Sequence, residues 1–219
     1  MAAPRPAEAR RAAKQDRQAG IIAAASALFA ANGFRGTTTR EIAKQAGVSE
    51  ALVFKYFPSK RALYAAILAE KSPLSQLMPA VEEAARKRDD ERVFRLIASF
   101  RIRRGTDPSL LRLLLFSALE GHELSEMFFK NQHRIFYDYL AGYIARRIED
   151  GAFRRVDPLL AARAFVGMIV YHRLLHEIFA VPADRSPEET VGAYVTLFLD
   201  GLRNPARRAR AKRTTLQCS

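Results

Sequence analysis

The chain has 219 residues, of which 49% are hydrophobic and 27% are charged, and its formal net charge is +13. This length and composition predict a folded protein with a sizeable core and exclude a disordered chain. Its single cysteine, Cys218, excludes an intramolecular disulfide framework and suits a reducing cytoplasm. Residues 1–20 lack a continuous apolar run, so we expect no signal peptide.

The positive charge lies at the two ends of the chain. Residues 1–71 carry a net charge of +7 and residues 203–219 carry +6, while residues 72–202 sum to zero. This division predicts a segment that binds a polyanion, joined to a body with an ordinary charge balance.

Apolar residues recur throughout at helical spacing, which predicts an all-α protein. The first helix is expected over residues 12–31 and ends at Asn32 and Gly33. Two short helices follow over residues 39–46 and 50–56. A fourth helix begins after Ser59, and its inward rows are Leu63, Tyr64, Ile67 and Leu68.

The most informative stretch is residues 38–60, TTREIAKQAGVSEALVFKYFPSK. Thr38 and Glu41 fit a capping box at the start of the first short helix. Gly47 stands where a helix end needs a left-handed residue, and Ser49 can cap the next helix. Two short helices joined by such a turn predict a helix-turn-helix, whose second helix would lie in a DNA major groove.

Prolines mark the starts of later helices, because Pro108, Pro158 and Pro187 each follow a capping residue. Gly151 and Gly201 are expected as helix C-terminal caps. Arg163 and Glu177 interrupt the apolar run of residues 158–181, so we expect a buried helix there and no membrane span. The predicted helices cover residues 75–104 (one or two helices), 108–119, 122–150, 157–180 and 187–203.

The N-terminal part resembles the DNA-binding domain of the tetracycline-repressor (TetR) family of bacterial regulators. The resemblance rests on residues 21–68, IIAAASALFAANGFRGTTTREIAKQAGVSEALVFKYFPSKRALYAAIL. It implies an N-terminal three-helix helix-turn-helix DNA-binding domain plus a C-terminal helical effector-binding and dimerisation domain. It also implies a homodimer that pairs through residues 157–180 and 187–203, with an effector pocket in the C-terminal domain.

The charge pattern and the resemblance together predict four segments. A disordered basic arm over residues 1–11 precedes a DNA-binding domain over residues 12–58. The ligand-binding and dimerisation domain covers residues 59–203, and residues 204–219 form a disordered basic tail. The arm enters the minor groove or is a solvated charge run, and the tail serves mainly solubility. The arm and the start of the first helix carry Arg5, Arg10, Arg11, Lys14 and Arg17.

The second short helix divides its residues by face. Leu52, Tyr56 and Phe57 are expected to face inward, which leaves the other positions for DNA. An outward Phe54 can contact thymine methyls, and Lys55 can reach guanine or phosphate; the alternative for Phe54 is packing against the first helix. The outward positions are Glu50, Ala51, Phe54 and Lys55.

Phosphate contacts are expected where helices begin, since backbone N–H groups and the helix dipole favour anions there. Thr38 either caps its helix only or also directs amides at a phosphate, and Glu50 either accepts from cytosine or simply favours the helix N-terminus. Tyr56 matches a family position that often touches phosphate. The predicted DNA-binding residues are Thr38, Thr39, Ser49, Glu50, Ala51, Phe54, Lys55, Tyr56 and Lys60.

A cavity between helices is the expected effector site, although aromatic residues at helical spacing are more often core. His172 and His176 stand four apart, but Arg173 replaces the Glu of a zinc-protease signature, so no metal is predicted. We find no catalytic motif and predict no enzyme and no cofactor. The candidate ligand-binding residues are Phe94, Phe116, Phe128, His133, Tyr137, Tyr171 and His172.

The favoured interpretation is a dimeric, bacterial, cytoplasmic repressor that a small, largely apolar ligand releases from a palindromic DNA operator. It would be associated with the nucleoid when bound to DNA. The alternatives are an activator, a regulator that recognises a partner protein, a non-specific nucleoid-type DNA-binding protein, and a small helical enzyme.

Overall fold

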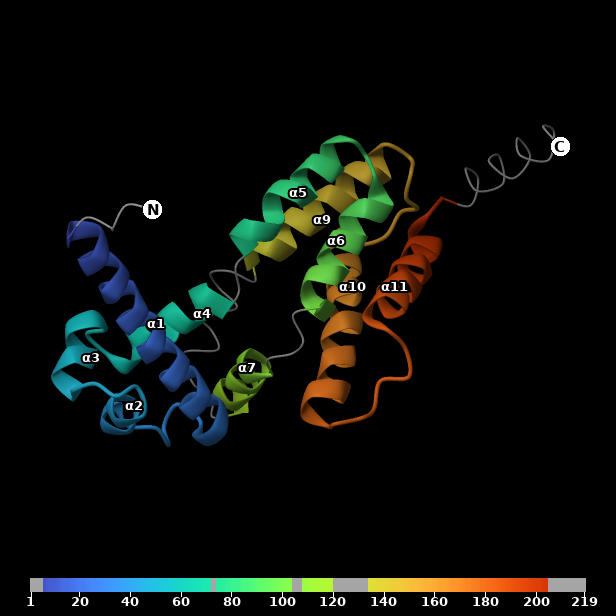
Figure 1. The fold of residues 1–219 in the computed structure, drawn as a ribbon. Helices are drawn as coiled ribbons and strands as arrows, with labels where there is room; N and C mark the ends of the chain where they lie inside the picture. Colours follow the sequence, from blue (N-terminus) through green and yellow to red (C-terminus); the bar gives the residue numbers. More distant parts are fainter. Residues whose placement is uncertain (1–5, 72–73, 104–107, 120–133, 205–219) are drawn as a thin grey trace, which may run out of the picture. The chain divides into compact units, whose positions relative to one another are not determined.

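Helices make up the regular structure of the protein (Figure 1). The computed structural model describes residues 6–71, 74–103, 108–119 and 134–204. Within these ranges no strand forms, and the only β-type pairing is one isolated bridge that joins the segments before α10 and after α11. The all-α prediction is therefore confirmed.

The chain divides into two compact units. The first contains residues 1–73 and 108–128, and the second contains residues 74–107 and 129–219. The helices of the first unit are α1 (Pro6–Asn32), α2 (Thr39–Gln45), α3 (Glu50–Tyr56), α4 (Lys60–Lys71) and α7 (Ser109–Leu119).

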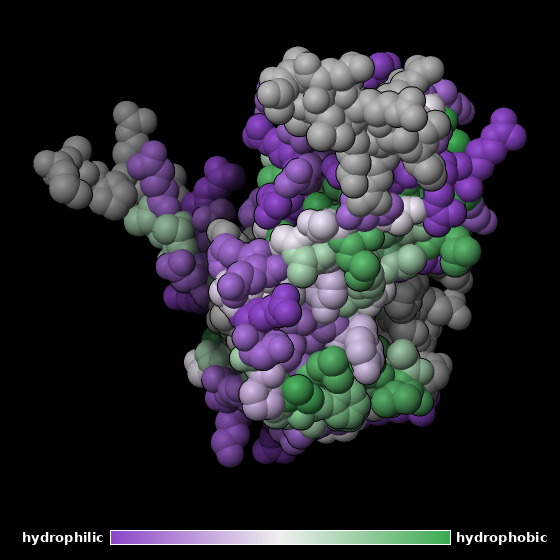
Figure 2. All heavy atoms as spheres, turned by 90° about the vertical axis from the view of Figure 1, so that its right-hand side faces the viewer, coloured by the Kyte–Doolittle hydropathy of each residue, from purple (hydrophilic) through white to green (hydrophobic). Residues whose placement is uncertain are grey.

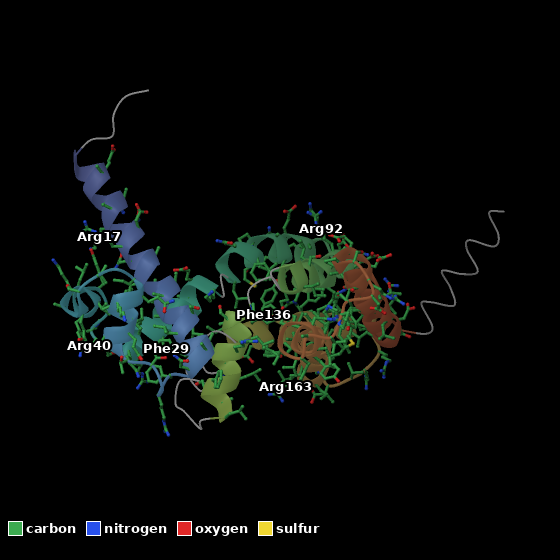
Figure 3. All side chains as sticks on the ribbon, turned by 60° about the horizontal axis from the view of Figure 1, so that its bottom comes forward. Arg17, Phe29, Arg40, Arg92, Phe136 and Arg163 are labelled. Atoms are coloured by element: carbon green, nitrogen blue, oxygen red, sulfur yellow. The ribbon has the colours of Figure 1, made fainter. Side chains whose placement is uncertain are left out.

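The core of the first unit joins apolar residues from all five of these helices. Phe29 of α1 is fully buried, and its ring centroid lies 5.2 Å from that of Phe34 and 6.3 Å from that of Tyr64 (Figure 3). The predicted inward rows of α4 are all buried, which confirms that prediction. Leu113 of α7 is buried in the same cluster, so the compact unit is larger than the domain predicted over residues 12–58.

The first helix begins earlier than the sequence pattern predicts. α1 starts at Pro6, so residues 6–11 of the predicted arm are helical and only residues 1–5 lie outside the described part. Proline is favoured at the first helical position, and the alanines that follow are strong helix formers. Lys14 and Arg17 are therefore exposed side chains on a helix, which corrects the expectation of a flexible arm at these positions.

The second unit is a set of longer helices that lie side by side (Figure 1). The expected one or two helices of residues 75–104 are two. The helix predicted over residues 122–150 is described from Arg134, and residues 120–133 lie outside the described part. The elements are α5 (Leu74–Arg86), α6 (Asp90–Arg103), α9 (Arg134–Glu149), α10 (Pro158–Arg173), the π-helical turn η2 (Leu174–Ile178) and α11 (Pro187–Leu202).

Capping residues begin the last two helices as predicted. The Asp157 carboxylate accepts from the Leu160 N–H at 2.9 Å, and Ser186 forms a complete capping box with Glu189. Gly151 ends α9 with φ +67°, also as predicted. Gly201 was expected to be a cap but lies within the last turn of α11, and its φ is not in the left-handed region.

An aromatic cluster and a buried ion pair fix the centre of the second unit. The Phe94 ring centroid lies 4.8 Å from that of Phe165 and 5.0 Å from that of Phe198. Close by, the Arg147 guanidinium donates to both carboxylate oxygens of Asp90 at 2.7 and 2.9 Å. These contacts join α6, α9, α10 and α11 into one core.

α10 and η2 together form the most apolar segment. Residues Pro158–Ile178 are long and apolar enough, by length and composition alone, to cross a membrane. Only one face of α10 is buried, through residues such as Phe165 and Ile169, and the opposite face is exposed. The predicted buried helix is therefore buried on one side only, which leaves an apolar surface without a covering element among the described residues.

Candidate nucleic-acid interface

The turn between α2 and α3 has the geometry that its residues predict. The Thr38 hydroxyl accepts from the Glu41 N–H at 3.2 Å, and the Glu41 carboxylate accepts from the Thr38 N–H at 2.7 Å. These bonds from Thr38 hold the pKa of Glu41 below its ordinary value. Gly47 has φ +66°, and Ser49 accepts from the Leu52 N–H at 3.2 Å. A helix-turn-helix is confirmed at residues 38–56.

The inner face of α3 anchors it to the first unit. Val53 is 1% exposed and Phe57, just after the helix, is 8% exposed, whereas Leu52 and Tyr56 are only partly buried. Val53, the main anchor, was not among the residues predicted to face inward. The signal was available, because Val53 and Phe57 are four residues apart and lie on one helix face.

The outer face of α3 is exposed at each of the four predicted positions, Glu50, Ala51, Phe54 and Lys55. Phe54 retains 46% of its surface, so it does not pack into the first-unit core. A buried valine on one face and an exposed phenylalanine on the other orient α3 as a presented recognition element. On this outer face Phe54 offers an apolar contact, Lys55 offers a positive charge, and the small Ala51 lets another molecule approach the helix closely.

Thr39 and Glu50 lie against each other. The Thr39 hydroxyl donates to the Glu50 carboxylate, which ties the first residue of α2 to the first residue of α3. Sequence analysis treated them as separate DNA contacts, since they are eleven residues apart. One carboxylate oxygen of Glu50 thus already accepts a hydrogen bond. Glu50 therefore also connects α2 to α3 within the motif.

Lys60 does not point outward as a phosphate contact. Its ammonium donates to the Phe34 carbonyl at 2.6 Å and to the Thr37 carbonyl at 2.7 Å, and lies 4.4 Å from the Phe34 ring centroid. The prediction of a phosphate contact is corrected for this structure. These three interactions explain why the side chain of Lys60 turns inward. Its partners lie more than twenty residues earlier in the chain, so the sequence pattern does not predict the contacts.

Of the remaining predicted DNA-binding residues, Thr38 and Ser49 are exposed caps, and Tyr56 is partly buried.

Other exposed cations lie on or next to the motif. Sequence analysis used only the net charge of this region and assigned no role to Arg35, Arg40 or Lys44. All three are exposed, and Figure 3 shows Arg40 pointing away from the core. Like Lys55, they are exposed cations on or next to the helix-turn-helix.

Comparison with known protein families identifies both parts of the chain. Residues 21–67 match the family described as bacterial regulatory proteins, tetR family. Residues 102–201 match the AefR-like transcriptional repressor C-terminal domain. The chain belongs to the TetR family. It is a DNA-binding transcriptional regulator of that family, and its helix-turn-helix is the family's DNA-binding motif.

Two curated relatives illustrate how the likeness is distributed. The chain is 46% identical over 52 residues to the uncharacterized HTH-type transcriptional regulator YvkB of Bacillus subtilis, which is 24% of this chain and 28% of YvkB. It thus spans about a quarter of that relative. It is 27% identical over 162 residues to the nucleoid occlusion factor SlmA of Aliivibrio fischeri, covering 71% of this chain and 81% of SlmA.

Solved structures share the fold over most of the chain. A transcriptional regulator of Pseudomonas aeruginosa PAO1 superposes with a TM-score of 0.68 at 27% identity, covering 86% of this chain and 90% of that one. AibR, solved in complex with isovaleryl coenzyme A and operator DNA, has a TM-score of 0.65 at 21% identity, covering 83% and 97%. The second likeness concerns the fold alone.

The predicted effector residues of this TetR regulator differ in burial and in the unit to which they belong. Phe94 is buried in the aromatic core, Tyr171 is 60% exposed, and Phe116 belongs to the first unit. Tyr137 is partly buried, and burial raises its pKa. Phe128 and His133 lie outside the described residues. Of the five described candidates, His172 alone lines a described pocket.

His172 and His176 face each other with ring centroids 4.3 Å apart. His176 Nδ1 lies 2.6 Å from the Val181 carbonyl, and burial together with His176 lowers the pKa of His172. Among the described residues no group of three metal-ligating side chains forms. The pair therefore belongs to the polar wall of a pocket of about 490 Å³ beside η2 and α11.

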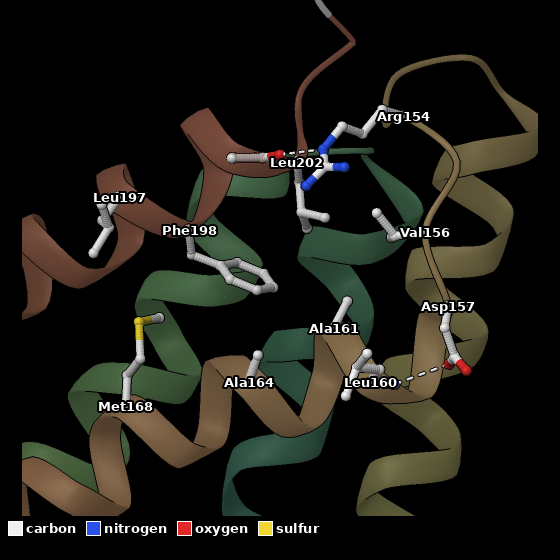
Figure 4. Close-up of a pocket in the computed structure, with 11 residues that line it drawn as sticks. Arg154, Val156, Asp157, Leu160, Ala161, Ala164, Met168, Leu197, Phe198 and Leu202 are labelled. Atoms are coloured by element: carbon white, nitrogen blue, oxygen red, sulfur yellow. Dashed lines mark hydrogen bonds between the residues drawn. The ribbon is translucent and has the colours of Figure 1, made fainter.

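A second surface feature lies between α10 and α11. A groove of about 300 Å³ is lined mainly by apolar side chains, and Phe198 points into it from α11 (Figure 4). At its end the Arg154 side chain donates to the Gly201 carbonyl at 2.5 Å. Exposed Leu160 and Leu197 stand on its two sides.

Proposed function

We propose that this TetR-family regulator is a dimeric repressor that binds a palindromic operator through α3 and is released by a small, largely apolar ligand. The observation that carries the proposal is the outer face of α3, where Phe54 and Lys55 stand exposed on a helix anchored by Val53. The likeness of residues 102–201 to a repressor C-terminal domain supports repression rather than activation.

In the DNA complex, α3 lies in the major groove. Phe54 packs on thymine methyls or sugar carbons, Ala51 allows close approach, and Lys55 donates to guanine or phosphate. Exposed Arg35, Arg40 and Lys44 hold the flanking phosphates. Lys60 keeps the turn before α2 in place through its two carbonyl contacts, so its role is to position the motif.

The exposed face of α10 and α11 supports the proposed dimerisation. Leu160 is 65% exposed, and Ala164, Gly167 and Tyr171 continue the same face at helical spacing. On α11, Leu197 is 65% exposed. Figure 2 shows hydrophobic side chains gathered in patches on the side of the molecule where α11 lies. Pairing of this face with its own copy buries these patches, and its two-fold symmetry explains a palindromic operator.

The ligand is bound in the second unit. Its core is apolar and aromatic, and helical bundles take apolar ligands between their helices. AibR, which shares the fold, was solved with isovaleryl coenzyme A and with operator DNA. Ligand binding changes which dimer conformation is favoured, and the altered dimer leaves the operator.

The likeness to SlmA favours a second candidate, a nucleoid-type protein that binds DNA at many positions. Selection from random DNA, followed by a salt titration, separates the two candidates. For the repressor we expect one palindromic site, bound about 10³-fold or more tighter than random DNA at moderate salt. Equal affinity for the selected and the random DNA would reject the repressor and leave the nucleoid-type protein.

A further inference from the structure

A partly exposed arginine of the second unit has a buried guanidinium nitrogen without a partner among the described residues. Arg101, near the end of α6, has its Nε buried, and this atom has no hydrogen-bond partner among the described residues. The guanidinium carbon stands 4.9 Å from the ring centroid of Phe136 on α9. An aromatic face offers a weak attraction to a cation but does not accept the five N–H groups of arginine.

Two other arginines of the same unit have carboxylate partners. Arg147 is held by Asp90, and Arg173 donates through two nitrogens to Glu177 at 2.6 and 2.8 Å. Arg101 has no such carboxylate among the described residues. The chain therefore provides counter-charges for Arg147 and Arg173 and leaves Arg101 unmatched within its described part.

The surroundings confirm that the charge is unfavourable where it stands. Burial is the main cause that lowers the pKa of Arg101 to about 10; Tyr137 acts in the opposite direction, and the charge of Arg173 acts in the same direction as burial. The group still carries its proton at neutral pH. An unpaired charge in an apolar interior destabilises the fold unless an anion joins it.

We propose that Arg101 is the anion anchor of the effector site and that the effector is an apolar molecule with one carboxylate. This inference rests on the proposed ligand-released repressor and specifies the chemistry of its ligand. The planar guanidinium fork matches one carboxylate in a bidentate pair. Tyr137, whose phenol interacts electrostatically with Arg101, brings a hydroxyl from α9 to the same region.

A single carboxylate fits the charges better than a phosphate group of a larger ligand. Arg173 is already neutralised by Glu177, so among the described residues Arg101 is the guanidinium with a buried, unpartnered nitrogen that is left for a negative charge. Apolar side chains also lie nearby, since Phe136 is fully buried under the guanidinium and Phe100 and Ile102, next to Arg101 in the chain, pack against the second-unit core. Arg101 as a residue is partly exposed, so a ligand can reach it.

The test compares matched ligands on two variants of the full-length protein. Saturated carboxylates from butanoate to hexadecanoate, each with its matched alcohol, are titrated by calorimetry against the wild type, Arg101→Met and Arg92→Met. Arg92 is an exposed arginine on α6, the helix that also carries Arg101, and serves as the control (Figure 3). We expect one range of carboxylates to bind more tightly than the alcohols, about ten- to a hundredfold weaker binding in Arg101→Met, and no change in Arg92→Met.

Thermal unfolding without ligand gives a second, independent readout. Methionine replaces an unpaired charge by an apolar chain of similar length, so Arg101→Met should have a higher Tm than the wild type. A lower Tm would show that the guanidinium is already paired within the protein and would overturn the proposal.

Other outcomes also overturn the carboxylate assignment. These are equal binding of carboxylates and alcohols, no binding at any chain length, and binding of dodecanoyl coenzyme A without binding of dodecanoate. Operator binding of each variant without ligand is measured in parallel. If an alcohol or the coenzyme A ester releases the operator, the repressor proposal stands while the anchor proposal fails; if no protein binds a selected operator, the repressor proposal itself fails.

Discussion

The ammonium of Lys60 lies against two backbone carbonyls and one aromatic face, all from the turn between α1 and α2. These contacts connect the start of α4 to the segment that leads into the helix-turn-helix. A charged donor shared by two carbonyls is a stronger tie than a neutral hydrogen bond. Lys60 therefore stabilises the position from which α2 begins.

Replacing Lys60 with alanine should destabilise the first unit by about 2–3 kcal/mol, since hydrogen bonds to a charged group are lost and two carbonyls are left without their donor. Urea unfolding measures the change. Lys55→Ala, which removes an exposed lysine of α3, is the control and should change stability by less than about 0.5 kcal/mol. If Lys60→Ala kept full stability but lowered the salt dependence of DNA binding, Lys60 would be a phosphate contact after all.

At the residue scale, sequence reasoning succeeded where the partner is near in the chain. The pairs Thr38–Glu41 and Ser186–Glu189 are three residues apart, and both capping boxes form as predicted. The contact of Thr39 with Glu50 and the position of Lys60 depend on how separate helices pack. Local spacing carries no information on such contacts.

The element that presents the recognition helix is the α2–α3 turn. Gly47 adopts φ +66° there, a conformation that costs an L-residue with a side chain free energy. Space is not the constraint, because a Cβ at Gly47 would meet no atom within 4 Å. The turn angle, and through it the direction of α3, depends on this backbone conformation.

Gly47→Ala should therefore destabilise the protein by about 1–2 kcal/mol through backbone strain alone. Gly20→Ala is the matched control, and its expected change in the free energy of unfolding has the opposite sign. Gly20 lies inside α1, and its added Cβ also meets no atom within 4 Å. It should stabilise the protein by about 0.5–1 kcal/mol. Equal effects of the two changes in thermal or urea unfolding would refute the strain argument.

At the element scale, the helices were predictable and some of their ends were not. Proline and capping residues marked the starts of α10 and α11 correctly. The start of α1 was placed too late, because its first two turns are charged and lack the apolar stripe used to recognise a helix. Gly201 was misassigned because glycine near a helix end does not by itself show that the helix ends there.

For the whole molecule, the proposed dimerisation depends on an exposed face of the second unit. Leu160 and Tyr171 of α10 and Leu197 of α11 belong to this face, together with the groove between the two helices. Ile135 of α9 is 70% exposed but does not line that groove. Ile135 is thus about as exposed as Leu160 and Leu197 but lies on a different helix, away from the groove between α10 and α11.

Leu197→Glu should convert the proposed dimer to a monomer, because two-fold pairing would place the new charge in an apolar interface. Native mass spectrometry measures the assembly state directly. Ile135→Glu is the control and should remain dimeric. A monomeric wild type, or dissociation of both variants to the same extent, would contradict pairing through α10 and α11.

The charge division along the sequence correctly indicated where the DNA-binding part lies, since the +7 region contains the helix-turn-helix. The proposed effector site was less predictable from the sequence. Phe94 and Phe165 are core residues, and an aromatic residue in a sequence carries no mark that separates core from pocket wall. The unmatched charge of Arg101 depends on burial and on the partners of other arginines.

The central claim, that the outer face of α3 contacts operator bases, is tested most directly by repeating the DNA selection with Lys55→Ala. Lys44→Ala, which removes an exposed lysine of α2, is the control. The account predicts that Lys55→Ala loses about 1–3 kcal/mol of discrimination at one base pair in each half-site, while Lys44→Ala keeps the preference and weakens all sequences alike. An unchanged base preference in Lys55→Ala would contradict the account.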